Sequence, residues 1–161
     1  MRACSTVRSC SSSAARRGEW AALDHWQLDL GIVGRSPPYE GVDALFQTSV
    51  PYVCLLPQTH RLARGKARLD LAELAATESF ITFGGAYPDE MLDMDRGLSA
   101  QLRKNSRLFA ANMPVAAVLV RETGALAIVD PYSAKLAQRI GGVVSRPIRQ
   151  SLKYHIAIVT R

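Results

Sequence analysis

Apolar and polar positions alternate in blocks along the chain, and the blocks have the lengths of strands and helices. Short apolar runs bounded by glycine, proline or charged residues are typical of buried strands. Near the end of the chain, the segments GGVVSRPI and KYHIAIV predict two strands. Five earlier strands are predicted at residues 28–33 (LDLGIV), 50–57 (VPYVCLLP), 79–83 (SFITF), 107–111 (RLFAA) and 125–129 (ALAIV).

Helices are predicted between several of these strands. Asp70 with Glu73 is an acidic variant of the capping box and opens the helix DLAELAA. Pro88, followed by two acidic residues, suits the first turn of a second helix. The apolar side of that helix is interpreted as core and consists of Met91, Met94, Leu98 and Leu102.

The last two helices have well-marked ends. Asn112 is the predicted N-cap of the helix MPVAAVLVRET, and Gly124 ends it. Asp130 is the predicted N-cap of the next helix, with Pro131 in its first turn. Strands that alternate with helices predict βαβ units, and therefore an α/β fold with a mainly parallel sheet.

The junctions between strands and helices are the predicted binding positions, because ligands of open α/β sheets bind beyond the carboxyl ends of the strands. Three junctions, at residues 84–88, 112–114 and 130–132, predict unpaired backbone N–H groups and the positive ends of helix dipoles. This pattern favours a small anion, either a carboxylate or a phosphate.

The glycine pair in FITFGGAYPDE does not match a nucleotide-binding loop. The segment fits neither G-x-x-x-x-G-K-[ST] nor G-x-G-x-x-G, and it has no lysine to reach a phosphate. Phe83 and Tyr87 flank the glycines, and they fit the wall of a pocket as well as ordinary packing.

The sequence has no catalytic or metal-binding constellation. Its three histidines are far apart, and there is no G-x-S-x-G elbow for a nucleophilic serine. The acidic residues Asp89, Asp93 and Asp95 share a predicted helix with Arg96 and are interpreted as a solvated face. We therefore expect no enzyme activity, no cofactor and no metal site.

Charge and cysteine content narrow the class of protein further. The net charge is +6, but the first 18 residues hold four arginines and no acid, so the remainder carries only +2. This argues against a DNA-binding surface on the globular part. The three cysteines form no metal-ligand spacing and no even disulfide set, and Cys54 is interpreted as a small buried side chain. No apolar run approaches the ~20 residues of a membrane span, so a cytoplasmic chain without a membrane partner is expected.

Several segments resemble, in order and spacing, the effector-binding domain of LysR-type transcriptional regulators. The family pattern is roughly D-L-G-I, a strand ending in L-P, H-x-L-A, D-L, a phenylalanine strand and V-x-x-G-x-G-[IV]-A-[IL]-[LV]. The resemblance covers about residues 28–150, and IVDPYSA is most similar to the branch that responds to opines and basic amino acids. The matching segments are LDLGIV, VPYVCLLPQTHRLARGKARLDLAELAATESFITF, VLVRETGALAIVDPYSAKLAQ and GVVSRPI.

The resemblance implies a periplasmic-binding-protein-like fold of type 2, with two Rossmann-like lobes. Strands at residues 50–57 and 145–153 would cross between the lobes, and a small effector would bind in the cleft. Effector binding would then shift how a dimeric or tetrameric regulator grips DNA. The implied partners are the effector and a second copy in a homodimer. DNA would be bound only through a winged helix-turn-helix, which is absent from this sequence.

On this resemblance the chain is truncated. Residues 1–22 stand where the DNA-binding region and the start of lobe I belong, and they are interpreted as a disordered or artefactual leader. Residues 23–57 and 146–161 are assigned to a partial lobe I with the crossing strands, and residues 58–145 to lobe II. Lobe II should fold, whereas the strand edges of an incomplete lobe I predict self-association or aggregation.

The resemblance also assigns effector contacts. They fall at the end of the D-L-G-I strand, at the start of the crossing strand, after the phenylalanine strand and at two helix starts. For Asp130, pairing with an amino or guanidino group of a basic ligand competes with a purely structural role as helix N-cap. The predicted contacts are Val33, Gly34, Thr48, Ser49, Thr82, Phe83, Gly84, Gly85, Asn112 and Asp130.

The sequence therefore predicts an effector-binding domain that senses a small carboxylate or amino-acid-like molecule and controls transcription. A solute-binding receptor of a transport system is the first alternative, but it would need an export signal. A non-functional regulator fragment is the second. An enzyme on the same scaffold would need a nucleophile, a base or a metal cluster that the sequence lacks.

Overall fold

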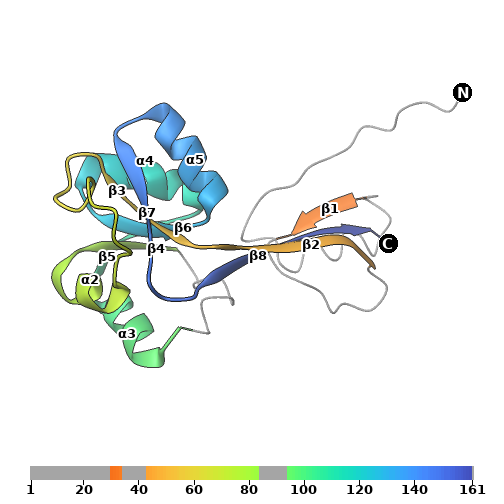
Figure 1. Cartoon of the computed structure of the whole chain (residues 1–161), viewed down its shortest axis with the longest axis horizontal. Helices are drawn as coiled ribbons and strands as arrows, with labels where there is room; N and C mark the ends of the chain where they lie inside the picture. Colours follow the sequence, from red (N-terminus) through yellow and green to blue (C-terminus); the bar gives the residue numbers. More distant parts are fainter. Residues whose placement is uncertain (1–29, 34–42, 84–93, 161) are drawn as a thin grey trace, which may run out of the picture. The chain divides into compact units, whose positions relative to one another are not determined.

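A computed structural model describes residues 30–33, 43–83 and 94–160. The chain forms two compact units, unit 1 (Met1–Ser49 with His155–Arg161) and unit 2 (Val50–Tyr154), and it passes between them within β2 and again within β8 (Figure 1). The elements are β1 (Leu30–Val33), β2 (Asp43–Pro51), β3 (Val53–Pro57), α2 (Leu71–Thr77), β4 (Phe80–Phe83), α3 (Arg96–Lys104), β5 (Ser106–Ala110), α4 (Met113–Thr123), β6 (Leu126–Val129), α5 (Pro131–Ile140), β7 (Val143–Pro147) and β8 (Lys153–Thr160).

Unit 2 is built on a five-stranded sheet with the order β5-β4-β6-β3-β7. β4 runs parallel to β5 and β6, whereas β3 runs antiparallel to β6 and β7. The prediction of a mainly parallel sheet is therefore wrong, because two of these four strand pairings are antiparallel. The physical reason is the entry point of β3. It starts where β6 ends, with Val53 opposite Val129, and so it must run in the opposite direction.

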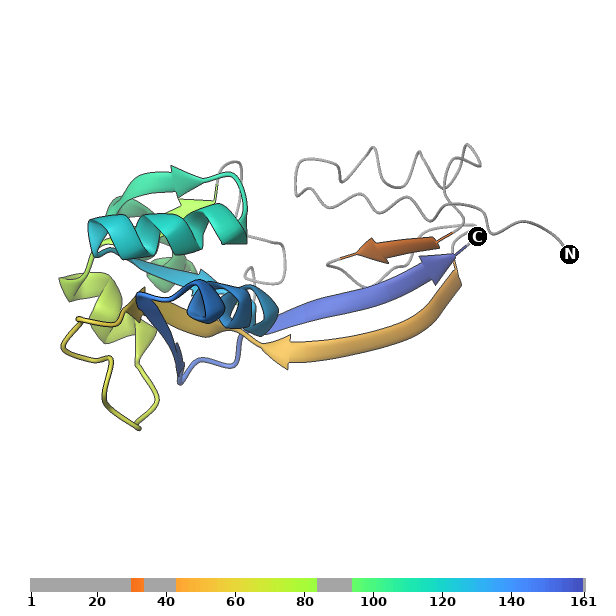
Figure 2. The same ribbon diagram turned by 90° about the horizontal axis from the view of Figure 1, so that it is seen from above.

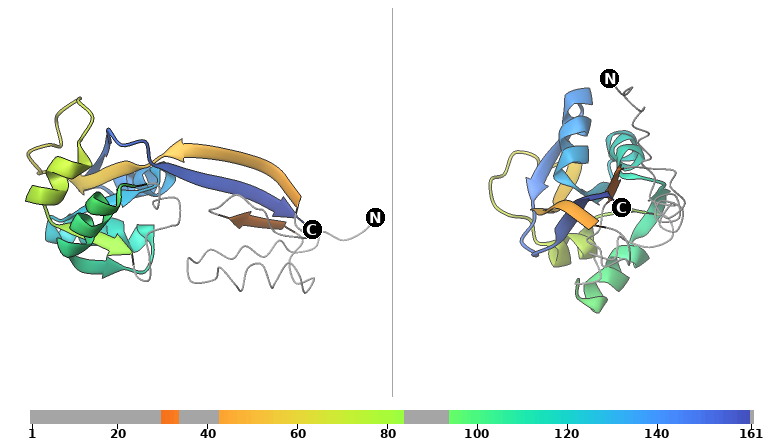
Figure 3. Two further views of the ribbon diagram at one scale, coloured as in Figure 1. Left: turned by 90° about the horizontal axis from the view of Figure 1, so that it is seen from below. Right: turned by 90° about the vertical axis from the view of Figure 1, so that its right-hand side faces the viewer.

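Helices cover both faces of this sheet. α4 and α5 lie on one face and α2 and α3 on the other, as Figure 1 and the view from below in Figure 3 show. Neighbouring residues of a strand point to opposite faces. Leu55 and Ile81 accordingly join the core under α4 and α5, while Leu56 and Phe80 join the core under α2 and α3. The sheet thus separates two apolar cores.

Unit 1 contains a three-stranded sheet with the order β1-β8-β2. β1 is antiparallel to β8, and Val33 lies opposite Ala157. Ala157 and Val159 of β8 are buried, but Ile32 of β1 and Phe46 of β2 are exposed. This sheet therefore buries only part of its apolar surface.

The prediction of one strand at residues 50–57 is wrong in one respect, because Tyr52 separates β2 from β3. Tyr52 is buried, its backbone N–H donates to the Leu152 carbonyl oxygen at 3.0 Å, and its ring meets that of Tyr154 edge-on with centroids 5.7 Å apart. β2 also extends back to Asp43, which the polar pattern of that segment did not predict.

The second predicted helix begins later than expected. α3 starts at Arg96, and Asp95 is its N-cap, accepting a hydrogen bond from the Leu98 backbone N–H at 3.1 Å. The placement of Met94 and Asp95 on a helix is therefore wrong, although Met94, Leu98 and Leu102 are buried as core. Pro88 and Met91 lie outside the described residues.

The other predicted helix ends are confirmed. Asp70, Asn112 and Asp130 are N-caps, and Gly124 ends α4 in the left-handed region with φ of 79°. A side chain there would be strained, which favours glycine. None of the helices in residues 43–83 and 94–160 is long and apolar enough to cross a bilayer.

Candidate functional site

The carboxyl ends of three strands of unit 2 meet at one edge of the sheet. Phe83 of β4 lies opposite Ala110 of β5, and the parallel register of β4 with β6 brings Val129 to the same level. We call this the carboxyl edge, defined by Phe83, Ala110 and Val129. Asn112 follows it into α4 and Asp130 follows it into α5, so both predicted caps lie at this edge.

The start of α4 offers hydrogen-bond donors. Asn112 Oδ1 accepts from the Val115 backbone N–H at 3.0 Å, and Pro114 has no N–H. Within the described residues, neither the Asn112 side-chain amide nitrogen Nδ2 nor the Met113 backbone N–H donates a hydrogen bond. Within the described residues, two donors thus lie unused at the positive end of a helix dipole.

The start of α5 has the opposite character. The Asp130 carboxylate is buried, and its Oδ1 accepts from the backbone N–H groups of Tyr132 and Ser133 at 2.8 and 2.9 Å. Pro131 has no N–H. The predicted open anion site at residues 130–132 is therefore wrong, because the chain supplies its own carboxylate there. Asp130 Oδ2 accepts no hydrogen bond within the described part of the chain.

Met113 connects the two helix starts. The Asp130 backbone N–H points to Met113 Sδ at a donor–acceptor distance of 3.2 Å. The first residue of α4 thus contacts the residue that caps α5. The starts of α4 and α5 therefore both follow the carboxyl edge and touch through this contact.

Thr82 lies just before this edge and is buried. Its hydroxyl is 2.8 Å from Ser106 Oγ, which also lies 3.0 Å from the Phe80 carbonyl oxygen. The pairing of β4 with β5 brings Ser106 to Thr82 across 24 residues of sequence. Neither Ser106 nor Met113 was predicted to contact these site residues, because nothing in the local pattern shows which strands pair.

The remaining predicted contacts fall elsewhere. Val33 ends β1, and Thr48 and Ser49 lie near the end of β2, all in unit 1. Phe83 is half-buried at the carboxyl edge. Gly34, Gly84 and Gly85 lie outside the described residues. All of these positions remain predicted effector contacts.

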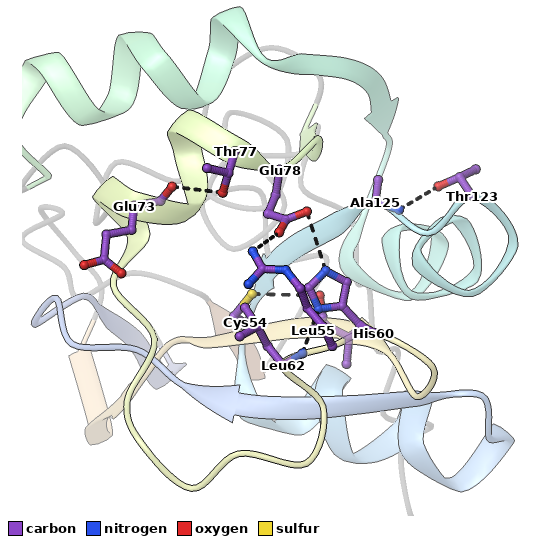
Figure 4. Close-up of polar contacts among 10 residues, drawn as sticks. Cys54, Leu55, His60, Leu62, Glu73, Thr77, Glu78, Thr123 and Ala125 are labelled. Atoms are coloured by element: carbon purple, nitrogen blue, oxygen red, sulfur yellow. Dashed lines mark hydrogen bonds and ion pairs between the residues drawn. The ribbon is translucent and has the colours of Figure 1, made fainter.

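A second polar cluster lies at the opposite edge of the sheet, where β4 and β6 begin. Glu78 Oε2 is 3.5 Å from His60 Nε2, and Glu78 Oε1 accepts from Arg61 at 2.6 Å (Figure 4). His60 Nδ1 accepts from the Leu62 backbone N–H. These contacts hold the segment after β3 against the end of α2, and they do not reach the carboxyl edge.

Cys54 lies on β3 and is fully buried, as predicted. Burial raises the pKa of its thiol to about 12, with Arg146 opposing and Glu78 adding to that shift. A thiol with so high a pKa is not a nucleophile near neutral pH. Among the described residues, no three histidine, cysteine, aspartate or glutamate side chains are placed to hold a metal ion.

Comparison with known families gives a match to the LysR substrate binding domain over residues 16–161. The chain belongs to this family. This is a family of transcription-regulator effector-binding domains and not an enzyme family. A comparison with curated protein sequences gave no significant match.

Solved structures show the same fold at low sequence identity. The chain is similar to a reduced form of OxyR from N. meningitidis, with TM-score 0.71 and 16% identity over 90% of this chain and 68% of that one. It is also similar to the effector binding domain of QuiR in complex with shikimate, with TM-score 0.67 and 17% identity over 90% of this chain and 68% of that one.

A third similar structure is full-length CbnR complexed with its target DNA, with TM-score 0.67 and 17% identity. There 89% of this chain matches 49% of the other, so this LysR domain spans about half the length of that regulator. The fold is therefore the type 2 periplasmic-binding-protein-like fold, and the predicted fold class is confirmed.

Proposed function

We propose that this LysR domain senses an amino-acid-like effector at the carboxyl edge of unit 2. One observation carries the proposal. The start of α4, whose Asn112 Nδ2 and Met113 N–H donate no hydrogen bond within the described residues, contacts the residue that caps α5 through Asp130 N and Met113 Sδ. A zwitterionic amino acid carries a carboxylate that complements the donors and an amino group that complements the Asp130 carboxylate.

The effector carboxylate is assigned to the start of α4. The Asn112 Nδ2 group and the Met113 N–H are donors, and the helix dipole favours negative charge at this position. An effector with a carboxylate alone would use this half of the site. Such an acid is the minimum ligand that the geometry supports.

The effector amino group is assigned to Asp130. Its Oδ1 is occupied by two backbone N–H groups, but Oδ2 accepts no hydrogen bond within the described residues. A buried carboxylate gains most from a cationic partner, because hydrogen bonds between ionised groups are the strong ones. An amino or guanidino group satisfies this requirement.

Binding is proposed to control transcription by shifting the population of regulator conformations that grip DNA. The family match supports this role over a transport receptor. The DNA complex of the full-length relative CbnR supports it as well, although that DNA contact belongs to CbnR and not to this chain.

The test is a thermal-shift screen of the full chain with free amino acids. Each compound that raises the midpoint is compared with the amine that lacks its carboxylate and with the acid that lacks its amino group. Because a ligand that binds the native state stabilises it, the complete amino acid should raise the midpoint more than either analogue.

Two substitutions test the two halves of the site one at a time, because each retains an oxygen that can cap its helix. Asp130→Asn keeps an N-cap acceptor but removes the charge, so it should weaken amino-acid binding roughly tenfold or more and leave the deaminated acid unaffected. Asn112→Asp keeps the cap but replaces the Nδ2 donor with a carboxylate, so it should weaken both compounds. Calorimetry measures these affinities, and a ligand insensitive to both substitutions would contradict the proposed site.

A further inference from the structure

The solvent-facing side of α5 carries a row of large apolar side chains. Tyr132, Leu136 and Ile140 are 51%, 50% and 63% exposed, and their spacing of four residues aligns them along the helix. The helix packs on the sheet through the small residues Ala134 and Ala137 on its opposite side. The exposed row is therefore not needed for the core.

Two cations flank this row. Lys135 and Arg139 are exposed, four residues apart, and in the described part of the chain neither forms an ion pair or a side-chain hydrogen bond. α5 contains no acidic residue. We call Tyr132, Lys135, Leu136, Arg139 and Ile140 the α5 surface.

The neighbouring helix also carries exposed apolar side chains. α4 lies beside α5 on the same face of the sheet, as the view from above shows (Figure 2). Val115 and Val118 of α4 are also exposed. An apolar surface with a charged rim is typical of a protein interaction site.

We propose that the α5 surface docks an acidic amphipathic helix of a partner protein. Such a helix lays apolar side chains at i, i+3 or i+4 and i+7 or i+8 against a complementary apolar surface. Carboxylates on its flank would pair with Lys135 and Arg139, which also steers the encounter.

The same charges argue against a symmetric antiparallel pairing of two α5 helices. In an antiparallel pairing of two α5 helices, the flanks that carry Lys135 and Arg139 fall on the same side of the contact. Four cations would then lie together without a carboxylate on either helix, which is unfavourable. An acidic partner removes this repulsion.

The test uses the full chain and a fluorescein-labelled helical peptide of about 15 residues, with leucines at i, i+4 and i+8, glutamates on one flank and alanines elsewhere. Fluorescence anisotropy should show saturable binding that weakens with added salt. Replacing the leucines with alanine or the glutamates with lysine should weaken binding at least about tenfold.

Variants of the chain locate the binding. Leu136→Glu and the double variant Lys135→Glu with Arg139→Glu should each weaken binding of the acidic peptide about tenfold or more. The matched control replaces Arg103 and Lys104 with glutamate. These two cations lie at the end of α3 on the other face of the sheet, so their charge reversal should leave binding unchanged. Thermal midpoints of all variants verify that the folds are intact.

Several results would overturn the proposal. No binding, or equal binding of the acidic and basic peptides, excludes an acidic partner. Self-association in sedimentation experiments that Leu136→Glu abolishes would make a second copy the occupant. Binding to phosphatidylglycerol vesicles that depends on Leu136 would show that the α5 surface binds membranes instead.

Discussion

At the scale of single residues, Asp70 shows how one carboxylate joins distant parts of unit 2. Its Oδ1 accepts from the Gln150 side chain and from the Ala72 backbone N–H, each at 2.9 Å, and its Oδ2 accepts from Arg149 at 3.0 Å. These contacts lower the pKa of Asp70 below 3.8, with the Gln150 hydrogen bond contributing most and the Ala72 N–H next. The carboxylate thus caps α2 and ties it to the segment after β7.

The lowered pKa predicts a dependence of stability on pH. Because the folded state holds Asp70 ionised more strongly than the unfolded state, this contribution is present above about pH 4 and is lost as the pH falls through the folded pKa. Asp70→Asn should lower the urea midpoint at neutral pH, and the gap to the unmodified chain should shrink below pH 4. Urea unfolding followed by circular dichroism measures this gap.

A second variant serves as the control for this pH effect. Gln150→Ala removes the largest contribution to the shift, so the pH dependence that Asp70→Asn removes should become smaller in that background. If the gap between Asp70→Asn and the unmodified chain stayed constant at every pH, the shift would not be linked to folding.

At the scale of elements, the segment between β3 and α2 depends on a residue far along the chain. Arg146 of β7 is buried, and its guanidinium donates to the carbonyl oxygens of Leu62 and Ala67. Gly65 lies so close that a Cβ there would stand 2.9 Å from Arg146 Nη1. Arg146 therefore contacts, at two points, a segment that has no helix or strand of its own.

Removing this cation should release the segment. Arg146→Met leaves the two carbonyl groups without their donor, and we expect a loss of about 1–3 kcal/mol in the free energy of unfolding. Hydrogen exchange should also become faster at residues 61–68. Arg61→Met is the matched control in the same segment, because its ion pair with Glu78 is largely exposed on the arginine side and should cost at most about 1 kcal/mol. Equal effects of the two substitutions would contradict the role of Arg146.

Local signals in the sequence predicted most of the helix ends at this scale. The N-caps at Asp70, Asn112 and Asp130 and the glycine stop at Gly124 are confirmed, because each depends on a few neighbouring residues. The start of α3 was misplaced. The prediction relied on Pro88 and its acidic neighbours, whereas Asp95 supplies the cap of α3.

At the scale of the whole molecule, unit 2 contains the elements of a complete domain. β3 is an interior strand of the sheet, between β6 and β7, and its residues Leu55 and Leu56 contribute one side chain to each core. The lobe II boundaries predicted from the resemblance, 58–145, exclude this strand. We therefore expect unit 2 to require β3 in order to fold.

Two fragments test this conclusion. Val50–Tyr154 should fold and unfold cooperatively in urea, because it retains both cores. The fragment 58–145 lacks β3 and should show no cooperative transition. Circular dichroism and near-ultraviolet spectra distinguish the two, and cooperative unfolding of the shorter fragment would show that β3 is not required for folding.

The sequence by itself determined the α/β class, the approximate places of most strands, the helix caps and the LysR family. These features depend on neighbours within a few residues or on an ordered set of short motifs. Only the tertiary structure decided which strands run antiparallel, that Ser106 meets Thr82, that Arg146 reaches Leu62, and that Met113 contacts Asp130. These contacts join residues far apart along the chain, and the order of strands in the sheet decides whether they meet.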